Sequence, residues 1–134
     1  MNKLKFLFAI MFCGILLTAI TSCSKHDVLP QANQSSVTGD WKLTLFFDSN
    51  DETSNFSGYK FSFNSGNTVT ATNGSNTVSG TWKIESSEFK IDFGTTAVFS
   101  DLNHSWLIEE NTGSSLKLKD DNISSNEKLQ FLKL

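Results

Sequence analysis

The sequence predicts an all-β protein, a small barrel of eight antiparallel strands in up-and-down order. Apolar and polar residues alternate with a period of two from Val37 onward, and short polar turns separate the alternating runs. Two segments, V-T-G-D-W-K-L at 37–43 and V-S-G-T-W-K-I at 78–84, resemble each other. A closed barrel is favoured because closure removes the exposed edges of an antiparallel sheet. A two-sheet β-sandwich shows the same alternation and is the alternative.

The two similar segments each place a Gly two residues before a Trp. Side chains two apart on a strand share a face, so Gly39 lies beside Trp41 and Gly80 beside Trp82. Gly within a strand marks a bend, a bulge or the close approach of another group. We expect the neighbouring indole to be that group, and predict that these four residues form the core that closes the barrel.

The predicted strands follow one another with short connections. Asn73-Gly74 predicts a tight hairpin, and 94–103 breaks the alternation, which predicts a helical turn or a loop that closes one end. In the last strand Leu129 and Phe131 fit the interior, while Leu132 falls on the other face and leaves the register open. The strands are expected at 37–47, 56–64, 68–72, 77–85, 88–93, 104–110, 115–119 and 127–134.

The N-terminal residues have the pattern of an export signal. Residues 1–22 combine basic residues near the start with an apolar run at 6–20, which is short for a membrane-spanning helix. Ile20-Thr21-Ser22-Cys23 resembles the lipobox of bacterial lipoproteins, which implies that Cys23 carries the lipid. An ordinary thiol at Cys23, or an uncleaved leader, is the alternative.

The resemblance divides the chain into a signal peptide at 1–22, a lipid-anchored flexible linker at 23–36 and a barrel domain at 37–134. Ser24 after the Cys implies, by the same resemblance, an outer-membrane position in the cell envelope, with the periplasmic or surface face left open. The membrane, reached through the lipid, is therefore the first expected partner.

The charge of the chain argues against two classes of partner. From Cys23 onward there are 9 Lys, 14 Asp plus Glu and no Arg, so the net charge is 9 − 14 = −5. An acidic domain without Arg is a poor binder of nucleic acid and of anionic lipid surfaces.

Gly39-Asp40-Trp41, on the first strand after a secretory leader, resembles the G-x-W signature of lipocalins. Trp106-x-Ile108, Thr112 and Leu116-x-Leu118 are similar to the lipocalin-like domains of bacterial envelope lipoproteins. The resemblance implies a barrel that binds a small apolar or amphipathic ligand. Lipocalins cover the first Trp with a late Arg; in this chain only Lys128 or Lys133 could take that place.

Large aromatic residues dominate the predicted interior. A small eight-stranded barrel is either filled by side chains or holds one small ligand, and filling is the more common outcome for aromatics at strand spacing. If a pocket exists at one mouth, the candidates to line it are Tyr59, Phe61, Phe63, Trp106 and His104. The full inward set is Trp41, Phe47, Tyr59, Phe61, Phe63, Trp82, Phe89, Phe93, Trp106 and Phe131.

No catalytic or metal-binding pattern stands out. The chain has 2 His, one of them in the linker, so His/Cys metal clusters and a Ser-His-Asp arrangement lack members. We therefore expect a protein without a cofactor or enzymatic activity that binds a ligand in its barrel. The alternative is a ligand-free structural or interaction module, which would dock an envelope protein through Phe46, Leu107 and the polar loop at 48–55.

Overall fold

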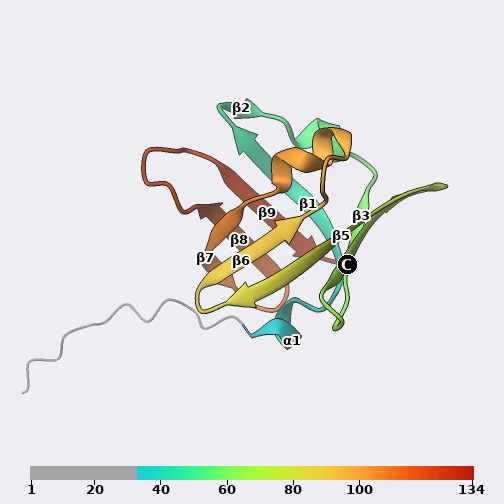
Figure 1. The fold of residues 1–134 in the computed structure, drawn as a ribbon, viewed down its shortest axis with the longest axis horizontal. Coiled ribbons are helices and arrows are strands. Elements are labelled where there is room, and N and C mark those ends of the chain that lie inside the picture. Colours follow the sequence, from blue (N-terminus) through green and yellow to red (C-terminus); the bar gives the residue numbers. More distant parts are fainter. Residues whose placement is uncertain (1–32) are drawn as a thin grey trace, which may run out of the picture.

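The computed structural model describes residues 33–134 and shows a closed antiparallel barrel of eight strands (Figure 1). This confirms the predicted fold class. The predicted signal peptide, Cys23 and most of the predicted linker lie outside the described residues. In the described part no helix is long and apolar enough to span a membrane.

The strands follow the chain around the barrel, each pairing with the next. β1 pairs with both β3 and β9, which closes the ring. The two-residue β2 pairs antiparallel with the last two residues of β1 and takes no other part in the sheet. The elements are α1 (Gln34–Val37), β1 (Gly39–Asp48), β2 (Asn50–Asp51), η1 (Thr53–Phe56), β3 (Lys60–Phe63), β4 (Thr68–Asn73), β5 (Asn76–Glu85), β6 (Glu88–Asp92), η2 (Ala97–Leu102), β7 (Ser105–Asn111), β8 (Ser115–Asp120) and β9 (Lys128–Lys133).

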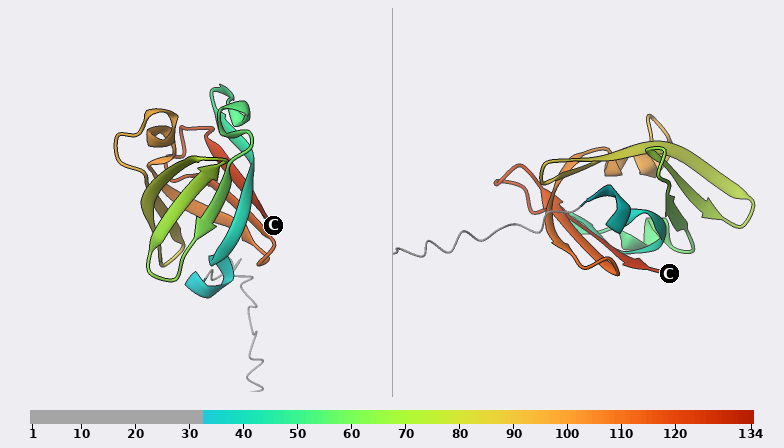
Figure 2. Two further views of the ribbon diagram at one scale, coloured as in Figure 1. Left: turned by 90° about the vertical axis from the view of Figure 1, so that its right-hand side faces the viewer. Right: turned by 90° about the horizontal axis from the view of Figure 1, so that it is seen from below.

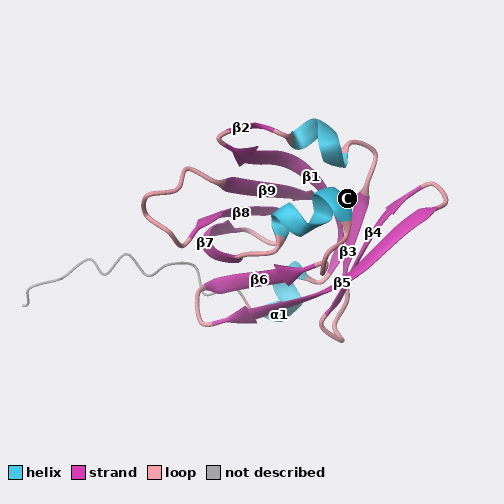
Figure 3. Ribbon diagram, turned by 45° about the horizontal axis from the view of Figure 1, so that its top comes forward, coloured by secondary structure: helices cyan, strands magenta, loops and turns pink. Residues whose placement is uncertain are grey.

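The two ends of the barrel differ (Figure 3). One end, which we call the α1 end, carries α1, the C-terminus and the tight turns at 64–67, 86–87 and 112–114. The other, which we call the loop end, carries β2, η1, η2 and the β8–β9 loop at 121–127. Longer connections therefore gather at the loop end.

Side chains fill the interior. Of 21 buried apolar residues, 11 are Phe or Trp, and each of the 21 is at most 4% exposed. Neighbouring rings meet at centroid distances between 5.0 and 6.3 Å, mostly edge to face, which is the preferred geometry of packed aromatic pairs. The described residues include no buried polar or charged residue. The default prediction of a filled barrel is therefore confirmed.

The prediction for the second half of the first strand is wrong. Phe46, expected to face outward, is 1% exposed in the core, and Phe47, expected inside, lies on the outer side. The pairing of β1 with β9 shifts between Leu43 and Leu45, so that two residues of β1 oppose Gln130 alone. Such a bulge inverts the alternation beyond it.

The starts of two strands also differ from the prediction. Val37, expected in the first strand, ends the short helix α1, which begins within the predicted linker. Phe56 belongs to η1, so β3 is shorter than expected. The segment at 94–103 holds the helical turn η2, as predicted. In β9, Leu129 and Phe131 are buried and Leu132 is 49% exposed, which settles the register.

Candidate functional site

The α1 end is sealed by Trp41. Its indole Nε1 donates a hydrogen bond of 2.6 Å to the carbonyl oxygen of Val37, the last residue of α1, and both residues are 0% exposed. Asn33 caps the helix, since its Oδ1 accepts from the Ser36 amide at 2.9 Å. This end of the barrel leaves no opening for a ligand between α1 and Trp41.

Lys133 takes the place over Trp41 for which the sequence offered Lys128 or Lys133. Its Nζ lies 5.2 Å from the indole centroid, a cation–π contact. The Lys133 stem also passes Gly39, where a Cβ would lie 3.0 Å from Lys133 Cε and φ is +129°. Lys128 lies at the opposite end of β9. The group that approaches Gly39 is therefore the lysine, and the expectation of an indole there is wrong.

Trp106 repeats this arrangement at the loop end. Its Nε1 donates at 3.1 Å to the carbonyl oxygen of Leu102, the last residue of η2. As with Val37 and Trp41, a buried apolar residue ends a helical turn four residues before the Trp. The two ends of the barrel are thus closed in the same way. The resemblance between segments 37–43 and 78–84 did not indicate this, because it pairs Trp41 with Trp82.

Gly80 lies directly before Thr81, the first residue of β5 that pairs with β6. A Cβ there would lie 2.3 Å from the carbonyl oxygen of Asp92 and 2.9 Å from Phe93 Cδ1. The expected partner, Trp82, instead donates its Nε1 to the Asn64 carbonyl oxygen at 3.0 Å. Gly80 is required because the backbone of β6 passes directly against it.

The five predicted pocket residues do not meet in one cavity. Phe61, Phe63 and Trp106 are at most 1% exposed and belong to the packed core. Tyr59 is half-buried and packs edge-on against Phe99 of η2, with ring centroids 5.0 Å apart. These rings plug the interior at the loop end.

His104 is the predicted residue that reaches solvent. Its side chain is 44% exposed, its ring centroid lies 5.6 Å from that of Trp106, and its Nε2 lies 3.8 Å from Glu127 Oε2. The latter contact is an ion pair only when the imidazole is protonated. His104 therefore lies at the rim and links η2 to the β8–β9 loop.

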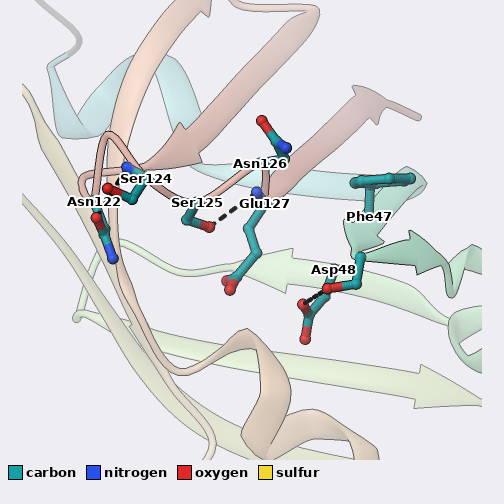
Figure 4. A pocket seen from close by; sticks show the side chains of 8 residues that line it. Phe47, Asp48, Asn122, Ser124, Ser125, Asn126 and Glu127 are labelled. Atoms are coloured by element: carbon teal, nitrogen blue, oxygen red, sulfur yellow. Dashed lines mark hydrogen bonds between the residues drawn. The ribbon is translucent and has the colours of Figure 1, made fainter.

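A polar groove of about 410 Å³ lies at this rim, between the end of β1 and the β8–β9 loop (Figure 4). Figure 4 shows the carboxylates of Asp48 and Glu127 extending to the same side of the groove from opposite walls. The Glu127 amide donates to Ser125 Oγ at 3.1 Å, which fixes the loop around its carboxylate. The lining residues are Phe47, Asp48, Ser49, Asn122, Ser124, Ser125, Asn126 and Glu127.

A second groove of about 350 Å³ adjoins the first on the outer wall. Leu45, Phe47, Asn126 and Lys128 line it, so Phe47 and Asn126 border both grooves. The bulge in β1 creates this arrangement, because it turns Leu45 and Phe47 outward at the rim. An apolar surface and a carboxylate-lined groove therefore meet at one aromatic ring.

Electrostatics at the rim favour ligands that donate hydrogen bonds. The first groove offers two carboxylates, two carboxamides and three hydroxyls, and its lining includes no Lys. Near it, partial desolvation raises the pKa of Asp120, but hydrogen bonds from the Asn122 amide and Ser125 hydroxyl outweigh this and leave the pKa below its usual value. Within residues 33–134 no group of His, Cys, Asp and Glu could hold a metal ion.

Another groove, of about 470 Å³, lies on the barrel wall around Trp82 and Ile91. Its two cations already have partners, since Lys83 and Lys90 contact the carboxylate of Glu85 at 2.7 and 2.9 Å. The rim grooves, which join two carboxylates to an apolar surface, are the better candidates for a binding site.

Comparison of the chain with protein-family models, curated proteins and solved structures found no match. The eight-stranded antiparallel barrel is consistent with the lipocalin-like resemblance of the sequence.

Sequence reasoning missed most of the rim. Asn122 to Glu127 has no alternation and resembles any solvated polar loop, and Phe47 was assigned to the wrong face. The one available signal was the length of that loop, which exceeds the tight turns at the α1 end.

Proposed function

We propose that this protein is a lipid-anchored, lipocalin-like lipoprotein of the bacterial cell envelope that binds a small amphipathic ligand without catalysis. The ligand lies across the rim of the loop end. Its polar group occupies the groove between Asp48 and Glu127, and its apolar part covers Leu45 and Phe47. The observation that carries this proposal is the meeting of the two grooves at Phe47 and Asn126.

The filled interior supports a rim site over an internal one. A ligand inside the barrel would have to displace Phe99 and Phe56, which are 3% and 2% exposed and whose centroids lie 5.5 Å apart. Burying each such ring is worth about 1.5–3 kcal/mol, so displacement would be costly. Binding at the rim leaves these contacts intact.

Anchoring at Cys23 would suit this placement. The described chain enters at Asn33 at the α1 end, which α1 and Trp41 seal. A tether attached there holds the α1 end toward the membrane and turns the loop end away from it. The binding rim then faces the periplasm or the exterior. Replacing Cys23 with Ala should release the protein from the membrane fraction, and retention there would refute the anchor.

The binding proposal is tested with two probes of equal chain length, an alkyl glycoside and a fatty acid, by isothermal titration calorimetry below their micelle concentrations. The glycoside head donates hydrogen bonds to Asp48 and Glu127, whereas the fatty-acid carboxylate is repelled by them. We expect the glycoside to bind more tightly. Equal affinity, or preference for the fatty acid, would contradict the assignment of the polar groove.

Matched variants locate the site. Removing the half-exposed ring in Phe47→Ala costs about 1 kcal/mol of binding free energy, so the glycoside should bind about fivefold more weakly. Leu132→Ala removes an exposed apolar side chain at the far end of the same wall and should have no effect. Similarly, Asp48→Asn should weaken binding, and Asp101→Asn, in the exposed part of η2, should not.

A ligand-free interaction module is the second candidate. Ile123, in the β8–β9 loop, is 99% exposed, and a groove of about 300 Å³ beside it is lined by Leu107 and Lys128 among others. Phe46 no longer supports this alternative, because it is buried. A module of this kind would lose a partner in Ile123→Ser and keep it in Phe47→Ala, whereas the rim site predicts the opposite order for ligand binding.

A further inference from the structure

We infer that the free edge of β5 is a self-association site, at which two copies of this chain pair their β5 strands antiparallel. The site comprises Asn76 to Gly80. The inference concerns a surface distant from the rim grooves and does not depend on the proposed ligand.

The edge is free because β5 is longer than its neighbour β6. Residues 81–85 of β5 pair with β6, whereas 76–80 pair only with β4 on the other side. Beyond Asp92 the chain leaves the sheet and continues toward η2. The β4–β5 hairpin consequently projects from the barrel (Figures 1 and 2).

β6 ends at Asp92 because the chain turns there: the Gly94 amide donates to Asp92 Oδ1 at 2.7 Å, and the Phe93 amide donates to Asn103 Oδ1 at 2.6 Å. The Asp92 carbonyl approaches the Gly80 backbone so closely that a Cβ would lie 2.3 Å from its oxygen. The strands separate beyond this contact, and the hairpin is held instead from the β4 side, where Asn73 Nδ2 donates to the Ser57 carbonyl oxygen at 3.4 Å. The geometry therefore exposes one edge of the hairpin only.

The register identifies the unpaired groups. Gly74 and Ser75 form a two-residue turn, so Asn73 and Asn76 make the hydrogen-bonded pair that flanks it. Hydrogen-bonded and non-hydrogen-bonded pairs alternate along an antiparallel ladder, so the backbone N–H and C=O of Thr77 and Ser79 point away from β4. No backbone partner for them on another element is found among residues 33–134.

These groups are self-complementary under a two-fold axis. If the axis passes beside Val78, Thr77 of one copy opposes Ser79 of the other, and each such pair exchanges two hydrogen bonds. Two pairs give four new backbone hydrogen bonds. The two Val78 side chains, which are only half-buried in the monomer, meet at the axis.

The absence of charge near this edge favours a second copy of the chain as the binding partner. Residues 61–82 contain no Lys, Asp, Glu, Arg or His, a run of 22 residues in a chain with 25 charged ones. Edge strands are ordinarily protected by charge or proline, and β5 has neither between Asn76 and Trp82. Two copies of an acidic domain can thus approach through this neutral hairpin without like-charge repulsion.

The test measures association of the full chain, expressed with its leader and extracted in mild detergent, by analytical ultracentrifugation up to about 1 mM. We expect a concentration-dependent dimer. The double variant Thr77→Lys with Ser79→Lys places like charges opposite each other twice and should weaken the dimer about tenfold.

A charge-reversed double variant, Thr77→Glu with Ser79→Glu, should likewise dimerise about tenfold more weakly alone, and should form a heterodimer when mixed with the lysine variant. The matched control is Thr70→Lys with Thr72→Lys, which adds the same charges to β4, whose two edges are already paired; it should dimerise like the unmodified chain. A chain that stays monomeric at the highest concentration, or a dimer that is not weakened in either double variant, would overturn the inference.

Discussion

Replacing Gly80 with Ala should destabilise the barrel more than the same substitution at a glycine with open space around it. The new Cβ would lie 2.3 Å from the Asp92 carbonyl oxygen and 3.1 Å from its carbonyl carbon, well inside the 3.4–4 Å of ordinary contact. Both atoms belong to the backbone, so no side-chain rotation relieves the clash. Overpacking of this kind costs typically 1–3 kcal/mol, and we expect about 3 kcal/mol because β5 and β6 must move apart.

Gly66→Ala is the matched control. A Cβ at Gly66 meets nothing within 4 Å, and its φ is not positive, so the same substitution should be neutral or slightly stabilising there. In urea unfolding followed by Trp fluorescence, Gly80→Ala should lose about 3 kcal/mol, with a melting temperature lower by roughly 10–20 °C. Equal stability of the two variants would refute the close contact between Gly80 and the Asp92 backbone.

Three further predictions address the packing and the surface charge. Phe46→Ala should cost about 3–5 kcal/mol of unfolding free energy and Phe47→Ala less than about 1 kcal/mol, as measured by urea unfolding; the reverse order would contradict the bulge in β1. Trp106→Phe removes the hydrogen bond to the Leu102 carbonyl oxygen of η2 and should lower the free energy of unfolding by about 1–3 kcal/mol. Amide hydrogen exchange in η2 should become faster, and unchanged exchange there would contradict the role of Trp106 in holding η2 over the loop end. Two lysines lower the pKa of Glu85 from 4.5 to about 2, so its carboxylate stabilises the fold above pH 4.5 and this contribution disappears as the pH falls toward about 2. Acid titration of Glu85→Gln should therefore show a stability deficit at neutral pH that vanishes at low pH, and a deficit independent of pH would contradict the pairing.

The fold was predictable because its signal is periodic. Alternating residues assign each of the eight barrel strands, and Asn73-Gly74 identifies the hairpin that the structure contains. The alternation also places Trp41 and Trp82 inside correctly. Where the pattern is regular, sequence and structure agree.

The candidate site was not predictable for the same reason. A single extra residue in β1 inverts the faces of Phe46 and Phe47, and a bulge leaves no trace in an apolar run such as Leu45 to Phe47. The rim loop at 121–127 has no period at all. The partners of both glycines come from distant strands, β9 and β6, and sequence reasoning could consider only the neighbouring Trp.

The central claim, that a ligand binds across the rim and not inside the barrel, is tested most directly by chemical-shift mapping with the alkyl glycoside. Amide signals of Phe47, Asn126 and Glu127 should move on titration, while those of the core residues Phe63 and Phe131 should stay. Shifts concentrated at Phe63 and Phe131, with the rim unchanged, would show that the ligand enters the barrel and would contradict the account.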